Sequence, residues 1–255
     1  MRRPAMLAAF ALLAAGCGGG GGSASPADIA QAAQKTSSTG SFEADFGISG
    51  QGLSGTGSGV FDNGDSPAGQ LTMTVKAAGQ QIPVDTVVTG DIFYMRSPAF
   101  ARTIGRGKQW IKLDLAKLAK QRGVDLGGLL NASPTPNNAL AYLGGADQVK
   151  KVGGEQVGGQ DTTHYRVRVD VSKAAHQAKG SARSSLEGVR ASGLAKLPID
   201  VWVDANGYIR KVSYQEHAGR RQAAKVTMKL HDFGRRVSIA PPPSASVFDL
   251  TRLQR

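Results

Sequence analysis

The chain contains few of the residues that build covalent or metal sites. One cysteine and four histidines occur in 255 residues, and aromatic residues make up 6% of the chain. A single cysteine excludes a disulfide within the chain, because that bond needs two. None of the histidines (His164, His176, His217 and His231) lies at short ligand spacing from another histidine or from the cysteine. The residues therefore predict no metal and no bound cofactor.

Local catalytic motifs are also missing. No Gly-x-Ser-x-Gly sequence occurs, so the nucleophile elbow of one large hydrolase class is absent. A serine, histidine and aspartate brought together from distant positions stays an open alternative. The segment 50–55 has the glycine spacing of a dinucleotide-binding loop, but it lies between two strand-like segments. That motif needs a following helix and a parallel sheet, so we interpret the glycines as a hairpin tip.

No apolar run approaches the twenty or so residues of a membrane-spanning helix. The clearest one, Met6–Ala15, follows Arg2 and Arg3 and has the length of a signal-peptide core. Small residues then lead into Cys17 and resemble a bacterial lipobox, although the usual leucine three positions before the cysteine is an alanine here. The resemblance implies that Cys17 carries a diacylglycerol and begins the mature chain. An ordinary signal peptide with a chance cysteine is the alternative.

Acidic residues are scarce relative to basic ones. The chain has 31 Lys and Arg against 19 Asp and Glu, a formal charge of +12, and removing Arg2 and Arg3 with the signal lowers it to +10. Such an excess favours anionic surfaces, and an envelope address favours lipid over nucleic acid. Because the charges are dispersed, an ordinary solvated surface explains them equally well. We expect a signal peptide at 1–16, a flexible tether at 17–25, one domain at 26–236 and a tail at 237–255.

Period-two alternation of apolar and polar residues predicts a series of short strands. Tight turns connect most of them, including an Asn-Gly turn at 206–207. Such an order indicates an antiparallel sheet with one apolar and one wet face. The predicted strands cover 42–48, 55–62, 71–77, 82–88, 91–96, 110–113, 147–152, 163–171, 199–204, 208–217 and 225–233.

Helical patterns interrupt the strands at three places. Ser25 and Pro26 suit the start of a helix at 26–35. Helices are also expected at 114–121, 124–130 and 137–143, and a polar one at 172–191 with a break at Gly180. The helices of the middle group are expected to cover the apolar face of the sheet. Whether the polar stretch joins that cover is left open.

The order of these motifs resembles the LppX/LprG-type lipoproteins of mycobacteria and their actinobacterial relatives, which share the fold of the LolA and LolB carriers. The resemblance rests on Cys17 with its glycine linker and on the segments 110–115, 165–170 and 197–212. It implies an α+β fold in which a large antiparallel sheet curves into a half-open barrel covered by short helices. It also implies a cavity for an acylated lipid or glycolipid, and no catalysed reaction.

The candidate cavity is drawn from inward strand positions and from the expected helices. Its members are Phe42, Ala44, Phe46, Leu71, Met73, Val75, Phe93, Met95, Leu115, Leu118, Leu126, Leu129, Leu140, Tyr165, Val167, Val169, Val201, Val203 and Met228. The same side chains could instead pack into a filled core. The sequence thus predicts a lipid carrier anchored on the outer face of the cell membrane. It is expected to be a monomer that binds lipid and no nucleic acid and meets a transport partner in the envelope.

Two other functions remain open from the sequence. The first is a structural or sensory envelope lipoprotein with a filled core. The second is an envelope hydrolase whose site has no local signature.

Overall fold

The computed structural model describes residues 24–50, 52–64, 67–90, 92–104, 107–114, 117, 135–191, 193–218 and 221–252. The expected signal peptide, Cys17, nearly all of the tether and the predicted helix at 124–130 lie outside this part of the chain, as does most of the helix at 114–121. Within the described part, no helix combines the length and the apolar character that a membrane span requires.

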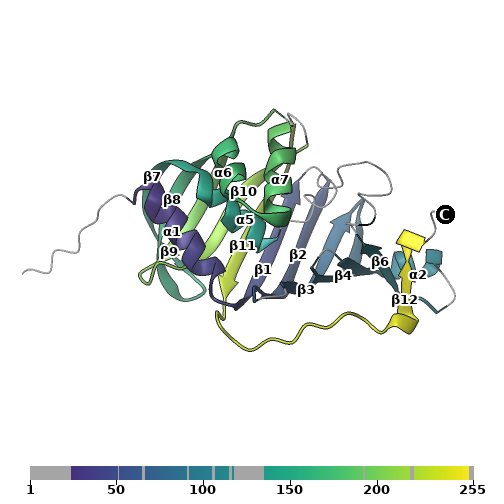
Figure 1. Ribbon diagram of the computed structural model, residues 1–255. Helices are drawn as coiled ribbons and strands as arrows, with labels where there is room; N and C mark the ends of the chain where they lie inside the picture. The colour runs from purple at the N-terminus through teal and green to yellow at the C-terminus, as the bar shows by residue number, and fades with distance from the viewer. Residues whose placement is uncertain are drawn as a thin grey trace, which may run out of the picture.

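A twelve-stranded sheet forms the backbone of the molecule (Figure 1). Its strand order is β12-β6-β5-β4-β3-β2-β1-β11-β10-β9-β8-β7. All neighbours pair antiparallel except β12 and β6, which pair in parallel. The strands are β1 (Ser41–Gly50), β2 (Leu53–Asp62), β3 (Ala68–Ala77), β4 (Gln80–Thr89), β5 (Ile92–Arg96), β6 (Trp110–Asp114), β7 (Ala146–Val157), β8 (Gln160–Asp170), β9 (Lys196–Asp204), β10 (Ile209–Ala218), β11 (Arg221–His231) and β12 (Val247–Asp249).

The expected strands are all present, and in several of them the alternation in sequence matches the burial. In β1, Phe42, Ala44 and Phe46 are buried while Asp45 is exposed. β1 lies at the centre of the sheet, where Phe46 pairs with Met228 of β11 on one side and with Gly57 of β2 on the other. The turn between β1 and β2 includes Gly52 at φ 71°, so segment 50–55 is a hairpin tip, as the sequence predicted.

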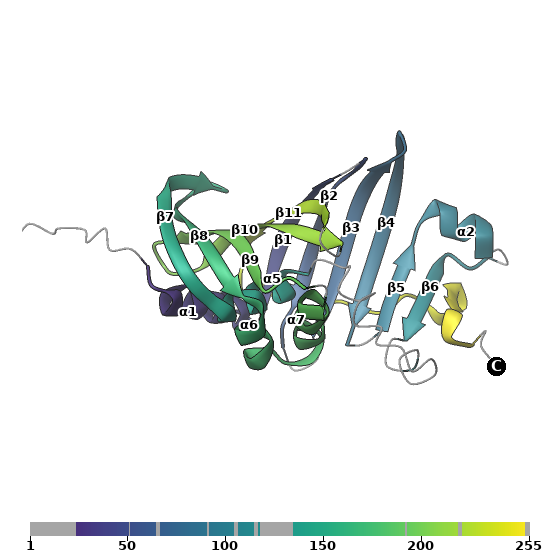
Figure 2. The same ribbon diagram turned by 90° about the horizontal axis from the view of Figure 1, so that it is seen from above.

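Helices form a layer on one side of this sheet (Figure 2). The layer consists of α1 (Pro26–Ser37), α5 (Pro136–Tyr142), α6 (Val171–Gln177) and α7 (Gly180–Ala191), with the short 3₁₀ turn η1 (Leu143–Gly145) after α5. At the start of α1, Ser25 and Asp28 form a capping box, which satisfies backbone groups that the helix leaves unpaired. The polar stretch at 172–191 forms α6 and α7, and its break lies just before Gly180.

Within the described residues, the helical layer covers one half of the sheet. Figures 1 and 2 show α1, α5, α6 and α7 over β7–β11 and β1, while β3–β6 extend beyond them. A continuous core lies between the layer and this half, and it includes Ile29, Leu143 and Leu186 from the helices. The sequence assigned the cover to the middle group of helices. In the structure α5 belongs to the cover, and α1, α6 and α7 supply the rest of the described part.

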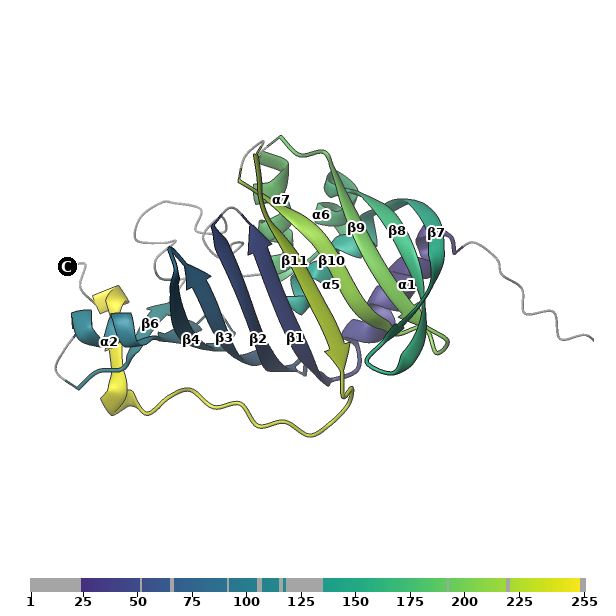
Figure 3. The same ribbon diagram turned by 180° about the vertical axis from the view of Figure 1, so that it is seen from behind.

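The end of the chain returns to the far edge of the sheet. After β11, residues 232–246 run along one edge of the molecule until β12 pairs with β6 (Figures 1 and 3). The Gln109 N–H donates to the Ser246 carbonyl at 2.9 Å, and Lys112 Nζ lies 3.2 Å from Asp249 Oδ2. The expected tail thus contains a strand, and the sheet, predicted as antiparallel, gains one parallel pair. The short helix α2 (Pro98–Ile104), which joins β5 to β6, was not predicted.

Candidate ligand-binding face

The described strand residues of the predicted cavity set lie on one face of the sheet. The register places Phe46 beside Met228, Leu71 beside Gly59, and Met95 beside Thr86, all at inward positions. Leu140 faces these strands from α5 and is buried. Leu115, Leu118, Leu126 and Leu129 lie outside the described residues. The described members of the set therefore share one face of the sheet. The half of that face under the helices and the half beyond them differ in packing.

Side chains fill most of the helix-covered half. Ala44, Val167, Val169, Val201 and Met228 have no exposed surface. Phe42, Phe46 and Leu140 are also buried, and Tyr142 of α5 meets Tyr214 of β10 edge to face with ring centroids 6.0 Å apart. This half behaves as a protein core, in which side chains interlock at high density.

Tyr165 and Val203 differ from the other covered members. They are partly buried and line a cavity of about 740 Å³ between α1 and the β8–β9 strands, together with Ile29 and Ala32. Asp28, Gln31 and Asn206 also line this cavity, so its wall is mixed. Such a lining offers both polar and apolar contacts.

The half beyond the helices presents a row of half-buried apolar side chains. We name this row the open apolar face. It contains Leu71, Met73, Val75, Phe93 and Met95 from the predicted set. The register adds inward residues that the predicted set omitted, although their alternation in sequence pointed to this face: Ile82, Val84, Val88, Ile111 and Leu113.

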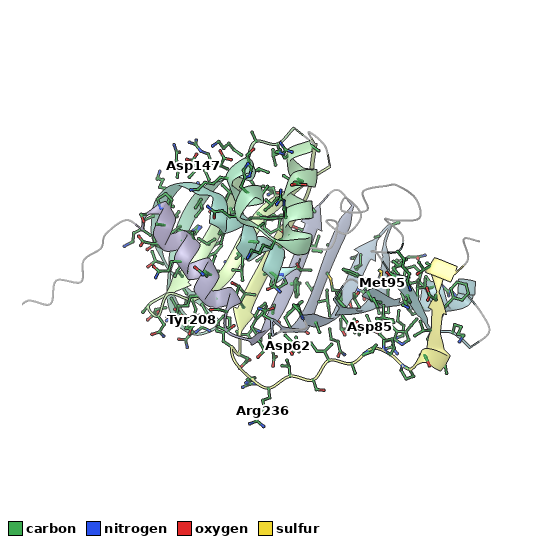
Figure 4. All side chains as sticks on the ribbon, in the orientation of Figure 1. Asp62, Asp85, Met95, Asp147, Tyr208 and Arg236 are labelled. Carbon is green, nitrogen blue, oxygen red and sulfur yellow. The ribbon has the colours of Figure 1, made fainter. Side chains whose placement is uncertain are left out.

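The open apolar face is continuous with the core. Leu71 and Met73 pack against the buried cluster, and Figure 4 shows Met95 farther along the same sheet, away from the helices. Apolar groups in this partly buried state favour contact with further apolar surface, at roughly 25 cal/mol per Å².

Glycines lie where the two halves meet. Gly55, Gly57 and Gly59 occupy the inward positions of β2. Neighbouring groups occupy the room that they leave. A Cβ on Gly57 would meet the Thr72 carbonyl oxygen and lie 2.6 Å from Met73 Cγ, and one on Gly59 would lie 2.8 Å from the Gln70 carbonyl oxygen and 3.1 Å from the Phe61 ring. The unbranched Met73 thus lies across β2 at the border of the open face. Such a side chain adapts readily to irregular apolar partners.

Polar contacts on the opposite face of the sheet join the strands that carry the open apolar face. Asp85 accepts two hydrogen bonds from Arg96 and one from Thr72, which joins β3, β4 and β5. The Arg96 guanidinium also lies over the Trp110 ring of β6, 4.9 Å from its centroid. These contacts place charge and hydroxyl groups on the outer face and leave the inner face aliphatic.

His164 and His231 lie on the polar face, as their strand positions predicted. His164 stacks on Trp202 with ring centroids 4.1 Å apart, and its Nε2 lies 2.9 Å from Asp200. The Lys211 ammonium also lies over the Trp202 ring, 3.9 Å from its centroid. Hydrogen bonds from Lys211 and Trp202 hold the pKa of Glu155 below its usual value. The cluster joins β7, β8, β9 and β10 by ordinary structural contacts.

One group of side chains has the spacing of metal ligands. The ligand atoms of Glu43, His231 and Asp232 lie within 4.8 Å of one another. Arg235 already supplies a cation there, since its guanidinium lies 2.9 Å from Asp232 and 3.8 Å from Glu43. A cation in this position opposes a metal ion, so we interpret the group as an ion-pair cluster.

Comparison with known proteins gives relatives among lipoproteins. No protein-family model matches the chain. An uncharacterized 31.2 kDa protein of Streptomyces griseus is 28% identical over 213 residues, which cover 77% of this chain and 69% of that protein. A Streptomyces coelicolor protein named "Putative lipoprotein" is 27% identical over 169 residues, 64% of this chain and half of its own length.

Solved structures show the same architecture. The lipoprotein LppX of Mycobacterium tuberculosis matches 84% of this chain and 97% of its own, with a TM-score of 0.53 and 15% identity. LprF of Mycobacterium bovis matches 87% and 99%, with a TM-score of 0.52 and 15% identity. The resemblance expected from the sequence is thus confirmed at the level of the fold: this chain has the large curved sheet and covering helices of the mycobacterial LppX-type lipoproteins.

Proposed function

We propose that the protein is a lipoprotein, tethered through acylated Cys17 to the outer face of the cell membrane, that binds a lipid or glycolipid and carries it in the cell envelope. The open apolar face is the observation that carries this proposal. Its aliphatic side chains are half-buried, continuous with the core and set in a fold shared with LppX and LprF.

The physical requirement is a protected place for acyl chains. Each methylene removed from water stabilises the bound state by about 0.8 kcal/mol, so a long acyl chain does not cross an aqueous gap unaided. Val84 pairs with Met73 across β4 and β3, and Met95 lies opposite Thr86. The aliphatic positions therefore form adjacent rows rather than isolated spots, which suits an extended chain. We propose binding and release, with no reaction catalysed.

A structural or sensory lipoprotein is the second candidate. Packing under most of the helical layer favours it, because Val167, Val201 and Met228 are fully buried there as part of the core. The two functions differ in what they expect at the open apolar face. A carrier binds lipid there, whereas a structural protein does not.

Native mass spectrometry of the non-acylated mature protein, produced in an actinobacterial host, tests the proposal. We expect co-purifying lipid with the wild-type protein. Val84→Trp should displace it, because the indole would fill space on the open apolar face. Thr74→Trp is the matched control, since Thr74 is exposed on the opposite face of the neighbouring strand. Lipid carriage should survive this second substitution.

Two results would overturn the carrier proposal. One is a wild-type protein that has no bound lipid and takes up none from added phospholipid or glycolipid. The other is equal lipid retention by the two tryptophan variants. Matching thermal unfolding curves for both variants would show that a loss of lipid is not a loss of fold.

A further inference from the structure

A groove crosses the helical layer on its outer side. It has a volume of about 980 Å³ and lies between α1 and the helices α5, α6 and α7. Small residues such as Ala30 and Ala141 line it, and two exposed lysines, Lys173 and Lys179, line its α6–α7 side. The groove differs from the open apolar face in place and in character, because it combines short side chains with cationic ones.

The helical layer carries an excess of positive charge. Its helices and the α6–α7 linker contain Lys35, Lys173, Lys179, Arg183 and Arg190, against two acidic residues, Asp28 and Glu187. Both acidic groups are engaged locally. Asp28 caps α1, and Glu187 pairs with Arg183.

Charges on the outer face of β7–β10 are balanced by comparison. Lys196 pairs with Asp147 and Asp170, and Lys211 pairs with Glu155. Arg166 pairs with Asp200. An anionic surface therefore gains more by approaching the helical layer than by approaching these strands.

The described part of the chain begins beside the groove. Ser25 and Pro26 line the groove at the start of α1. Eight residue steps separate Ser25 from Cys17 in the sequence, so a fully extended tether spans at most about 30 Å. A protein held by Cys17 thus keeps this end of α1 near the bilayer, and small rotations bring the lysines within the roughly 10 Å range of surface electrostatics.

We propose that the helical layer docks on anionic phospholipid headgroups of the membrane that holds the tether, with Lys173 and Lys179 contacting lipid phosphates. This inference rests on the proposed acylation of Cys17. The helices lie on the same side of the sheet as the open apolar face (Figure 2). Docking therefore turns that face towards the bilayer, so that an acyl chain passes between membrane and protein along a short path.

Vesicle flotation with the mature chain carrying Cys17→Ser tests the docking surface without the acyl anchor. Vesicles of phosphatidylcholine alone are compared with vesicles of phosphatidylcholine and phosphatidylglycerol in equal parts, at low and at physiological salt. We expect binding only to the anionic vesicles, weakened by salt. Lys173→Glu with Lys179→Glu should reduce the bound fraction by at least about tenfold, since each basic residue near an anionic surface contributes measurably.

The matched control is Lys225→Glu with Lys229→Glu. It makes the same change in net charge at two exposed positions of β11, on the outer face of the sheet. Binding should stay within about twofold of wild type. Hydrogen exchange on anionic vesicles should slow in 171–191 and not in 225–231. Equal loss of binding in both double variants, or no preference for anionic vesicles, would overturn the inference.

The experiments distinguish failure of the docking proposal from failure of the carrier proposal. The α6–α7 variant keeps the open apolar face, so its lipid content in native mass spectrometry should equal that of wild type. A protein that floats with anionic vesicles yet never carries lipid would refute only the carrier proposal.

Discussion

Arg210 donates a hydrogen bond from Nε to Asp204 Oδ2 at 2.6 Å, and the Asp204 side chain is only 3% exposed. The other carboxylate oxygen, Oδ1, accepts from the backbone N–H groups of Asn206 and Tyr208, each at 2.9 Å. One buried carboxylate thus closes the β9–β10 hairpin and neutralises a largely buried guanidinium. Its removal would leave that cation and two amides without their partner.

We predict that Asp204→Ala lowers the free energy of unfolding by about 3–5 kcal/mol, as expected when one member of a buried ion pair is lost. Urea unfolding followed by circular dichroism measures the change. Asp161→Ala, at an exposed position in the β7–β8 hairpin, should cost no more than about 0.5 kcal/mol. Similar losses for the two variants would contradict the role given to Asp204.

Two methionines on the same face of the sheet should respond differently to truncation. Met228 is fully buried under the helices, while Met73 is half-buried at the border of the open apolar face. Met228→Ala should destabilise the protein by about 2–5 kcal/mol, because it leaves a cavity in a packed core. Met73→Ala should cost about 1 kcal/mol or less, because less surface is buried there. A small effect at Met228 would mean that the covered half is not packed.

Gly57 of β2 and Gly47 of β1 test how closely β3 packs against β2. A Cβ on Gly57 would clash with the Thr72 carbonyl oxygen and lie 2.6 Å from Met73 Cγ, whereas one on Gly47 meets no atom within 4 Å. Gly57→Ala should therefore destabilise the protein by about 1–3 kcal/mol through overpacking. Gly47→Ala should be neutral or slightly stabilising, because it restricts the unfolded chain. Thermal unfolding distinguishes the pair, and equal midpoints would count against the predicted clash.

Asp170 at the start of α6 should make the stability of the fold depend on pH. It caps α6 through the Lys173 N–H and pairs with Lys196 at 2.8 Å. The hydrogen bond from Lys196 and the one from the Lys173 backbone hold the pKa of Asp170 below its usual value. A lowered folded-state pKa adds stability above the unfolded-state pKa, and this contribution disappears as the pH falls through the folded-state value.

We predict that Asp170→Asn is less stable than wild type at neutral pH and that the difference vanishes in acid. Asparagine still caps the helix, so the variant isolates the charge from the cap. Unfolding midpoints measured from neutral pH to below the usual Asp range follow the difference. A gap that stays constant with pH would show that the charge of Asp170 does not stabilise the fold.

The strands could be predicted because their signal is local. Alternation along 42–48 and 163–171, and the Asn-Gly turn at 206–207, depend only on neighbouring residues and reappear as β1, β8 and the β9–β10 hairpin. The cap at Ser25 is local in the same way. These features also sufficed to predict one apolar and one polar face.

The division of the apolar face could not be predicted, because it depends on contacts between distant residues. Val75 and Val167 alternate with polar neighbours alike, yet one is half-buried and the other has no exposed surface. Helices α6 and α7 read as polar, although Ala174 and Leu186 are buried in the core. The three-residue strand β12 gave no signal of its own, since its place is set by pairing with β6.

The pairing of β1 with β11 has a consequence for how the protein matures. β1 begins the sheet in the chain, but its second neighbour, β11, lies some 180 positions later. Contacts so distant in sequence slow folding, because a long loop must close before they form. The seam that unites the two halves is thus completed only after β11 has been synthesised, and a product truncated before β11 keeps its β1 edge exposed to other chains.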